Sequence, residues 1–413
     1  MSSDLLQQAL PGSTLVVAID PGKVTHRVWF STSDGGLLEE PRSVPALRPG
    51  LDEIEATIRR LVGVTAPVVA IEATGALHGP WVRALEERFP SSVRVFAPSE
   101  TAAARAQLGS RRFKSDDRDC AALTYLARQG QGRPVVEDPV EAMRAAVRYR
   151  RGLVAERKVA QQRLHDQLNA LCPGLSAPAG HGRALELDDP SGQAVLACAV
   201  AFAGRAPSAR SLQARAPGRL FASNARYWAE RWKQCLPPPP DAAVRAERLG
   251  RSVTRWQAIR ADVAAVETEI ETLLATTAGQ VLTTLPGVGV IRAAGFAAFS
   301  LPIERFPSAE HLYSATGLAP ARYQSATINR TGRISRTGLA EHRDALMGIA
   351  WGLSQRCAPF AERDAELRAR GMAPIQARVA LARHACRLTY RMLHTQQPFD
   401  EQRYRQSRHP SGR

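Results

Sequence analysis

Short apolar runs alternate with longer amphipathic stretches over the N-terminal third of the chain. The apolar runs predict strands at residues 14–19, 26–31, 67–71 and 93–96. The amphipathic stretches predict helices at residues 51–63, 77–89, 98–108 and 116–130. The sequence SDGG at residues 33–36 favours a hairpin turn between strands. This alternation is typical of an α/β domain, here residues 1–135, whose mixed sheet has an antiparallel edge and helices on its faces.

The pattern from Pro139 onward becomes purely helical. Apolar residues follow a partial helical stripe from Pro139 to Leu171 and a near-heptad spacing from Asp241 to Thr277. These two stretches predict long helices that pair as a coiled coil, within the chain or between subunits, in a connector of residues 136–277. Residues 173–240 are rich in Pro, Gly and Ala and end in four prolines, which indicates an insert with some helix.

The remainder predicts a mainly helical C-terminal domain over residues 278–398. Leu285, Pro286, Gly287, Val288 and Gly289 separate two helical runs, as in a helix-hairpin-helix-like element, whose backbone N–H groups can hold a DNA phosphate. An ordinary turn is the alternative. Residues 341–356 and 374–394 predict the closing helices. Residues 399–413 form a basic tail, which we expect to be disordered from Gln402 to Arg413. The fold class is therefore α/β plus all-α.

Two of the predicted strands end in an acidic residue followed by a glycine turn. Asp20 ends the run LVVAID, and Glu72 ends the run VVAIE. If these strands are parallel neighbours, both carboxylates lie at the carboxyl edge of the sheet, where open α/β sheets place their sites. Asp116 and Asp119 are three residues apart and share a face of a predicted helix, from which Asp117 points away.

Carboxylates that lie close together repel one another, and a divalent cation is the usual remedy. Ordinary structural roles are the alternative, because an arginine or a backbone cap can satisfy Asp20, and acidic residues suit the first turn of a helix. Taken together, the acidic groups favour a metal site formed by four carboxylates.

Charge points to an acidic partner. The chain of 413 residues has a net charge of +16 and a pI of about 10.4, and nearly all of its basic residues are Arg. This excess predicts a nucleic-acid partner. Residues 311–346 combine hydroxyl groups, Ser325 and Ser335 among them, with the arginines Arg322, Arg330, Arg333 and Arg336. A serine among cations is a candidate phosphate contact or phosphoryl-transfer nucleophile, and a solvated loop is the alternative.

Other classes of protein are disfavoured. The sequence has no apolar run of 18 residues, so we expect no membrane span. It begins without a basic segment followed by an apolar core, so we expect no secretory signal. The six cysteines show no CxxC spacing and are interpreted as free thiols in a reducing cytoplasm.

Several short motifs together resemble one family. In the N-terminal part they are AIDPGK at 18–23, AIEATG at 70–75 and KSDDRDCAAL at 114–123. In the C-terminal part they are LPGVG at 285–289, GLAP at 317–320, QS at 324–325 and ISRTG at 334–338. Each motif is weak alone, but their order and spacing resemble those of the DEDD-type insertion-sequence transposases, a bacterial group that includes Piv-type DNA invertases and bridge-RNA-guided recombinases. The resemblance covers roughly residues 14–170 and 245–395.

The resemblance implies a RuvC-like (RNase H-type) N-terminal domain whose four acids, Asp20, Glu72, Asp116 and Asp119, bind Mg²⁺. It also implies a C-terminal domain with a catalytic serine, which motif position assigns to Ser325. The family usually has a glycine after that serine, whereas this chain has Ala326, which leaves Ser335 as the alternative. Further nucleic-acid contacts fall on Lys114, Gly287, Gly289 and the four arginines. The implied partners are donor and target DNA, a non-coding guide RNA, and further copies of the chain in a dimer or tetramer.

Three functions compete at this point. The first is a transposase or recombinase that forms a phosphoserine link to DNA and reseals strands without ATP. The second is a RuvC-like nuclease, such as a junction resolvase, that only hydrolyses DNA. The third is a non-catalytic nucleic-acid-binding module with a structural acidic cluster. The paired acids on strand ends argue against the third, and the serine-bearing domain argues against the second.

Overall fold

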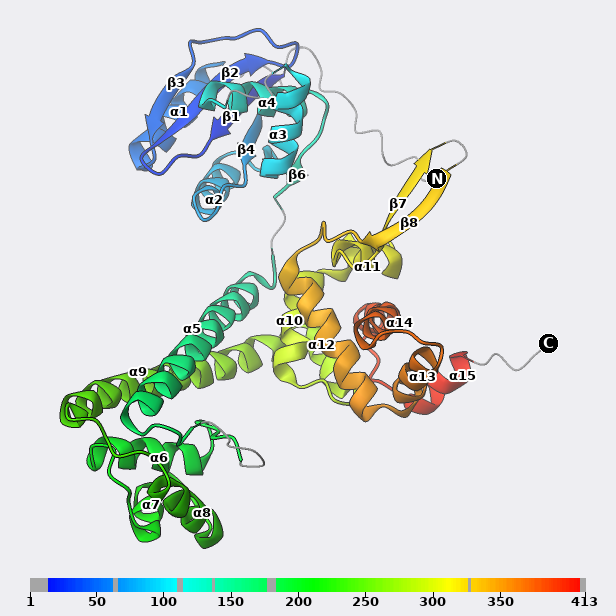
Figure 1. Ribbon diagram of the computed structural model, residues 1–413. Helices are drawn as coiled ribbons and strands as arrows, with labels where there is room; N and C mark the ends of the chain where they lie inside the picture. Colours follow the sequence, from blue (N-terminus) through cyan, green and yellow to red (C-terminus); the bar gives the residue numbers. More distant parts are fainter. Residues whose placement is uncertain are drawn as a thin grey trace. The chain divides into compact units, whose positions relative to one another are not determined.

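The computed structural model describes residues 14–61, 66–109, 114–135, 138–176, 183–325 and 328–408. The chain divides into two compact units, Met1–Glu137 and Asp138–Arg413 (Figure 1). The finer division into a connector, a C-terminal domain and a tail stays a prediction. In the described residues no helix is both long enough and apolar enough to span a membrane.

A six-stranded mixed sheet forms the centre of the first unit. Its strands are β1 (Leu15–Asp20), β2 (Thr25–Thr32), β3 (Arg42–Pro45), β4 (Val68–Glu72), β5 (Val93–Phe96) and β6 (Arg133–Pro134), in the order β3-β2-β1-β4-β5-β6. β1, β4 and β5 are parallel, while β2, β3 and β6 pair antiparallel with their neighbours. This mixed sheet is consistent with the expected RuvC-like domain. The edge strands β3 and β6 were not predicted, because both are short and neither contains an apolar run.

Helices cover both faces of the sheet because its central strands are apolar throughout. α1 (Arg48–Leu61) and α2 (His78–Arg88) pack on the face that carries Val17, Ile19 and Ile71. α3 (Pro98–Gln107) and α4 (Asp116–Arg128) pack on the face that carries Val16, Ala18 and Ala70. Successive strand residues point to opposite faces, so Asp20 and Glu72 belong to the face covered by α3 and α4.

The second unit begins with the long helix α5 (Glu141–Leu171). A second long helix, α9 (Ala242–Ala275), packs against it. The start of α5 shares a core with the end of α9, and the end of α5 shares a core with the start of α9, so the helices run antiparallel. The prediction of a long helical pair within the chain is confirmed, while coiled-coil geometry stays a prediction.

The insert folds as three helices, α6 (Pro190–Ala201), α7 (Ala209–Arg215) and α8 (Ala222–Lys233). They share one hydrophobic core with the end of α5 and the start of α9. Trp256 of α9 is fully buried in this core, together with Trp228 and Trp232 of α8. The expectation of partial helix in this segment is therefore confirmed.

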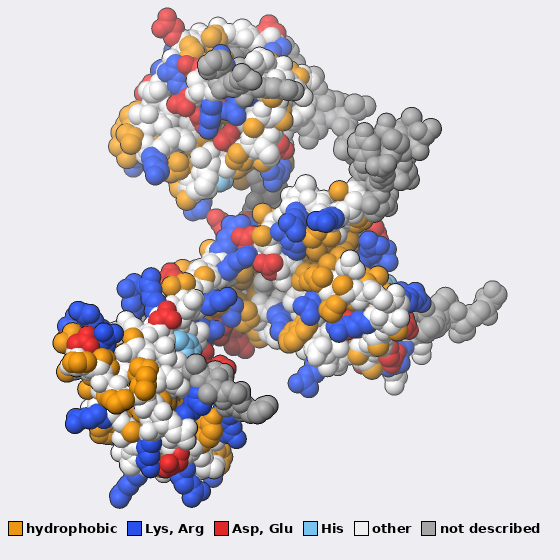
Figure 2. Space-filling view, in the orientation of Figure 1, with side chains coloured by type: hydrophobic (Ala, Val, Ile, Leu, Met, Phe, Trp, Pro, Cys, Tyr) orange, Lys and Arg blue, Asp and Glu red, His pale blue; other side chains and the backbone are white. Residues whose placement is uncertain are grey.

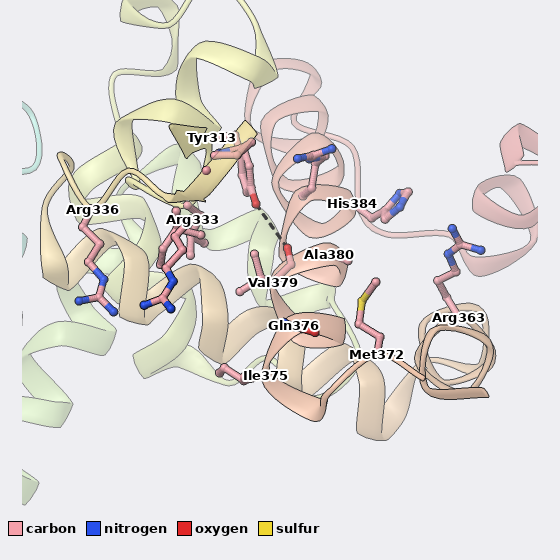
Figure 3. A pocket seen from close by; sticks show the side chains of 15 residues that line it. Tyr313, Arg333, Arg336, Arg363, Met372, Ile375, Gln376, Val379, Ala380 and His384 are labelled. Atoms are coloured by element: carbon pink, nitrogen blue, oxygen red, sulfur yellow. Dashed lines mark hydrogen bonds between the residues drawn. The ribbon is translucent and has the colours of Figure 1, made fainter. Parts of the chain in front are cut away.

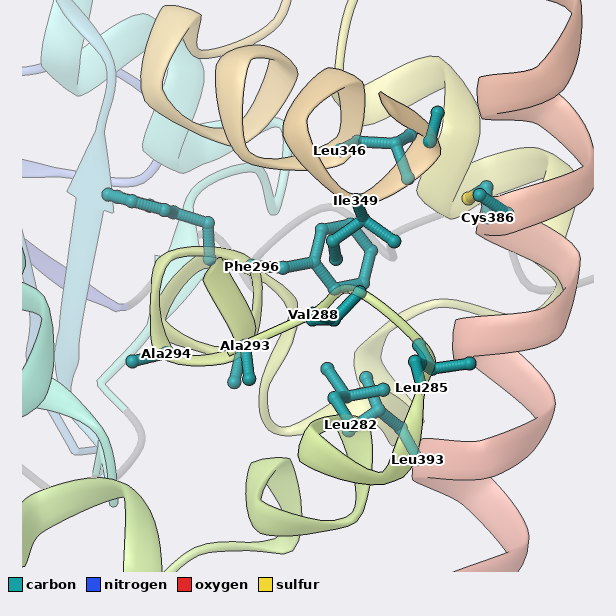
Figure 4. Close-up of a cluster of buried hydrophobic side chains, with 14 of the residues drawn as sticks. Leu282, Leu285, Val288, Ala293, Ala294, Phe296, Leu346, Ile349, Cys386 and Leu393 are labelled. Carbon is teal, nitrogen blue, oxygen red and sulfur yellow. The ribbon is translucent and has the colours of Figure 1, made fainter. Parts of the chain in front are cut away.

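The rest of the second unit is mainly helical around a second core (Figure 4). Its elements are the 3-10 helices η2 (Ala278–Thr284) and η3 (Ile303–Arg305), and the helices α10 (Val290–Ser300), α11 (Ala309–Ala315), α12 (Ala340–Arg356), α13 (Ala358–Ala369), α14 (Pro374–Thr395) and α15 (Glu401–Arg408). Phe296 of α10 packs there with Ile349 of α12, beside Val288 from the turn before α10.

One element of this part was not predicted, and one expectation was wrong. The polar segment around residue 325 is an antiparallel hairpin, β7 (Pro320–Ser325) with β8 (Ile328–Ile334), and its polar sequence contains no apolar alternation to reveal it. The tail is helical over α15, where Tyr404 is 8 % exposed and stacks on Phe360 with ring centroids 5.5 Å apart. One buried aromatic residue ties an otherwise charged helix to the core. Residues 409–413 lie outside the described residues.

We expect Trp256→Ala to lower the free energy of unfolding of the second unit by about 3–5 kcal/mol, because it leaves a cavity between the insert and the helix pair. Trp256→Phe is the matched control. It keeps most of the ring and removes an indole N–H that is buried without a hydrogen-bond partner among the described residues, so it should cost less than about 1.5 kcal/mol. Chemical denaturation followed by circular dichroism measures both, and equal losses would contradict this account of the core.

A buried histidine should make the second unit sensitive to acid. His342 of α12 is 2 % exposed and lies 3.0 Å from the Ser300 hydroxyl, and burial followed by the charge of Arg305 lowers its pKa from 6.5 to about 3. The unfolded state therefore binds a proton more readily than the folded state below pH 6.5. Stability should fall by about 2 kcal/mol between pH 6.5 and pH 5. His342→Gln should remove that slope, whereas the exposed control His394→Gln should retain it, as denaturation at each pH would show.

Candidate active site

Asp20 and Glu72 end adjacent parallel strands at the same level. The strand register pairs Ile19 of β1 with Ile71 of β4, so the two acids follow at equivalent positions. Glu72 is 8 % exposed and accepts a hydrogen bond from the Thr74 hydroxyl at 3.1 Å. The sequence prediction that these acids meet at the carboxyl edge of the sheet is consistent with this register.

α4 brings two more carboxylates to the same edge. Ser115 caps the helix by accepting a hydrogen bond from the Arg118 N–H, which fixes the helix start at Asp116. Asp119 follows one turn later and is 1 % exposed, while Asp116 is exposed. Cys120 anchors this turn, with its Sγ 3.8 Å from the Ala18 carbonyl oxygen of β1.

Asp117 faces away from this group, as the helical spacing predicted. Its Oδ1 accepts hydrogen bonds from Arg27 Nε at 2.6 Å and from Trp29 Nε1 at 2.9 Å, both on β2. These bonds lower the pKa of Asp117, and the hydrogen bond from Arg27 is the largest cause. Asp117 therefore holds α4 against the sheet while Asp119 turns toward the strand ends.

The electrostatics of Asp20 indicate that the four acids lie close together. Burial is the largest cause that raises its pKa, to about 6, and the negative charges of Asp119, Glu72 and Asp116 raise it further. Lys114 opposes the shift. Lys114 therefore does not offset the combined effect of burial and the neighbouring carboxylates on Asp20.

Two cations already contact Asp119. Arg105 of α3 donates a hydrogen bond to Asp119 Oδ1, and Lys114 Nζ lies 3.8 Å from Oδ2. Burial nevertheless raises the pKa of Asp119, outweighing the opposing effect of both cations. Sequence reasoning missed Arg105, although a buried acid on α4 requires a counter-charge and a basic residue on the preceding helix could supply one.

These residues fit a hard divalent cation by the chemistry of their donors, because all four supply carboxylate oxygens. They are not arranged as a closed metal cage: over the described ranges, no group of three or more His, Cys, Asp or Glu residues has the geometry of one. Arg105 and Lys114 neutralise Asp119 instead. Because Arg105 contacts Oδ1 of Asp119, a cation would bind Asp119 through Oδ2, from which Lys114 Nζ lies 3.8 Å.

The second unit carries the other predicted site residues, at the β7–β8 hairpin. Ser325 is the last residue of β7 and pairs in register with Ile328. The side chains of Ser325, Arg322 and Arg330, together with the whole of Ala326, lie outside the described part of the structure. The assignment of the serine and of these two arginines stays a prediction.

Arg333 and Arg336 are exposed at the base of the hairpin and line a groove of about 1010 Å³ (Figure 3). The opposite side comes from α13 and α14, with Arg363, Arg383 and His384 among its residues. The apolar part of the lining includes Leu318, Ile334, Met372, Ile375 and Val379. Tyr313 of α11 closes one end by donating its hydroxyl to the Val379 carbonyl oxygen at 3.3 Å. A groove with a basic rim and an apolar floor suits a ligand that combines phosphate with a flat apolar surface.

Ser335, the alternative nucleophile, directly follows β8 and is half-buried, with its hydroxyl 3.1 Å from that of Thr337.

The glycine turn before α10 has a packing role. Gly287 adopts φ +76°, and a Cβ there would lie 2.4 Å from the Gly352 carbonyl oxygen of α12. Around Gly289, by contrast, a Cβ would meet open space. Phosphate binding by these two glycines stays a prediction.

Models of known protein families match parts of both units. A family model described as a transposase matches residues 17–173, and a model of the Transposase IS116/IS110/IS902 family matches residues 279–365. A comparison with curated proteins found no match. The first model covers all four acids and the second covers Ser325 and the nearby arginines. The chain therefore belongs to the IS110/IS116 insertion-sequence transposases of the DEDD type.

Proposed function

We propose that this transposase cleaves and rejoins DNA strands by using the four carboxylates together with a serine nucleophile. The observation that carries the proposal is the gathering of acids at one edge of the sheet, where the register of β1 and β4 brings Asp20 beside Glu72. Burial raises the pKa of Asp20 to about 6, and the charges of Asp119, Glu72 and Asp116 raise it further. A buried acid cluster without full neutralisation is costly to a fold and is typical of a functional site. Membership of a transposase family makes DNA the substrate.

Asp20, Glu72, Asp116 and Asp119 would hold Mg²⁺ in this proposal. A divalent cation bound there would stabilise negative charge on the phosphoryl oxygens and favour the ionised form of a nearby hydroxyl. Arg105 favours the ionised form of Asp119 and orients its carboxylate. Because Arg105 comes from α3, it also places a cation beside the site that could contact the DNA phosphate.

Ser325 would act as the nucleophile. Its hydroxyl loses a proton as its oxygen bonds to phosphorus, and one DNA strand leaves as a free hydroxyl. The new phosphoserine ester conserves the energy of the broken phosphodiester bond, so a hydroxyl from another strand can reverse the step and release the serine. Arg333 and Arg336, exposed on the same hairpin, would neutralise phosphate charge. The mechanism requires DNA to engage both units, from one chain or from two.

A guide RNA and assembly into a dimer or tetramer complete the proposal, and the family resemblance is their basis. The positive charge of the second unit is compatible with RNA. Purification of the chain from its native cells should yield one discrete non-coding RNA. Specific strand cleavage that survives complete ribonuclease digestion would remove the RNA from the proposal.

The alternative is a nuclease that only hydrolyses DNA, which the RuvC-like sheet alone would favour. The two functions differ in one product. Incubation with Mg²⁺ and junction DNA of the element, followed by denaturing electrophoresis, should reveal a protease-sensitive DNA adduct if the serine attacks. A hydrolase would release two free DNA ends and no adduct.

We expect Asp20→Asn to abolish strand cleavage and to raise the melting temperature in a chelating buffer at pH 7.5. At this pH the wild-type carboxylate is ionised although the folded protein disfavours that charge, so the neutral amide removes repulsion. Asp117→Asn is the matched control, since it makes the same change on α4 but faces β2. It should keep cleavage and lower stability by roughly 0.5–1 kcal/mol through loss of its partly exposed pair with Arg27. Cleavage by Asp20→Asn would exclude the proposed site.

We expect Ser325→Ala to abolish the protein–DNA adduct and strand exchange together, because alanine has no oxygen to bond to phosphorus. Ser335→Ala, ten residues along the same chain segment, should retain both. Mass spectrometry of the digested adduct should place the phosphodiester remnant on Ser325. Free DNA ends produced by Ser325→Ala at the wild-type rate would favour the hydrolytic nuclease, and an adduct that persists there but disappears in Ser335→Ala would reassign the nucleophile.

A further inference from the structure

The net positive charge of the chain comes entirely from its second unit. Residues 1–137 contain 16 basic and 16 acidic residues, so the unit with the carboxylate site has no net charge. Residues 138–413 contain 39 basic and 23 acidic residues and carry the whole excess of +16. A neutral unit with an acidic site attracts DNA weakly, so the affinity for phosphate has to come from the second unit.

The insert of residues 173–240 contains eight basic and four acidic residues, and its positive excess lies in its helical part. Residues 190–240, which include α6, α7 and α8, contain seven basic residues and one acidic residue. The acid, Glu230, is paired with Lys233 at 2.7 Å. Neither of the two family models extends over this segment, since they match residues 17–173 and 279–365. Its charge therefore calls for an explanation of its own.

Four arginines of the insert have no acidic partner among the described residues. Arg210 and Arg215 belong to α7, Arg219 to the loop after it, and Arg226 to α8, and all four are exposed. Some exposed arginines elsewhere in the second unit are paired, as Arg251 is with Glu247 at 2.5 Å and Arg405 with Glu362 at 3.0 Å. Figure 2 shows several Lys and Arg side chains on the part of the second unit formed by α7 and α8, among apolar and other side chains.

Two of these guanidinium groups are held in place by aromatic rings. Arg215 lies over the Phe202 ring and Arg219 over the Phe221 ring, each 4.8 Å from the ring centroid. Phe221 is itself 56 % exposed. An arginine that rests on a ring keeps its N–H edges available and loses less freedom when it binds a phosphate. The pairs therefore present fixed cations on the surface.

The insert also provides a rigid base for this surface. Leu212, Trp228 and Trp232 belong to the same buried core as Leu168 of α5 and Leu249 of α9. The arginines are thus mounted on a folded module continuous with the long helix pair, and not on a loose tail. A rigid cationic surface of this kind suits a rigid polyanion.

We propose that the insert is a second DNA-binding site, on which Arg210, Arg215, Arg219 and Arg226 contact the phosphates of duplex DNA without reading its sequence. Duplex DNA is favoured because the chain is a transposase, whose substrate is DNA, and because these four side chains offer only cations. The site holds DNA flanking the point of cleavage and supplies affinity that the neutral N-terminal unit lacks.

The test measures binding of the full chain to a duplex of arbitrary sequence by fluorescence anisotropy at several salt concentrations. Chelating buffer is used so that no cleavage occurs. The variant replaces the four arginines with glutamine. Each phosphate contact contributes about 0.9 to the slope of log affinity against log salt, so the slope should decrease by up to about 3.6. At physiological salt the affinity should fall at least about tenfold.

The matched control is Arg59→Gln, Arg60→Gln, Arg251→Gln and Arg405→Gln, which removes four positive charges that are paired with acids. The net charge changes equally, so a general charge effect would shift both variants alike and would overturn the proposal. Replacing the four insert arginines with lysine should keep most of the slope, which separates loss of charge from loss of fold. Thermal unfolding of each variant provides the second check.

Two further results would count against the proposal. A duplex RNA of equal length that loses affinity in the glutamine variant, while DNA does not, would assign the surface to RNA. An unchanged DNA slope with weaker capture of polyglutamate would assign it to an acidic protein. Binding is measured without cleavage, so the binding result can be interpreted even if the serine mechanism is wrong. Likewise, a negative binding result does not affect the interpretation of the adduct experiment.

Discussion

Negative charge gathered at the carboxyl edge of a buried sheet is the constraint on which the N-terminal unit depends. Asp119 is 1 % exposed and Glu72 is 8 % exposed, so water solvates neither charge well. An unpaired carboxylate in such a place is costly, and the fold supplies Arg105 and Lys114 to offset part of the cost. The remainder appears at Asp20, whose pKa rises to about 6. This charge is what the proposed cation would offset.

α4 connects this charge to the rest of the fold through three neighbouring side chains. Asp117 binds Arg27 and Trp29 on β2, Cys120 packs against the β1 backbone, and Asp119 is held by Arg105 from α3. Each contact fixes a different side of the helix. The position of Asp119 is therefore determined by packing and hydrogen bonds that persist whether or not an ion is bound, which is the preorganisation that a phosphoryl-transfer site needs.

The sequence predicted the parts of this arrangement that follow from local patterns. Apolar runs that end in an acid located β1 and β4, and the three-residue spacing of Asp116 and Asp119 placed them on one face of α4. Arg105 was missed because the partner of a buried acid is chosen by tertiary packing. The β7–β8 hairpin was missed because its strands are polar and gain no apolar pattern from burial. α15 was misjudged because a single residue, Tyr404, supplies its contact with the core.

The separation of charge between the two units follows from the same constraint. A unit that gathers carboxylates cannot also present a strongly cationic surface nearby without neutralising them, as Arg105 already does for Asp119. Cations meant for DNA have to be placed on other elements. In this chain the net positive charge lies on the second unit, including an insert in which two of the exposed arginines, Arg215 and Arg219, rest on aromatic rings. In the proposed function, the net charge of +16 therefore reflects the combination of an acidic site with an acidic substrate.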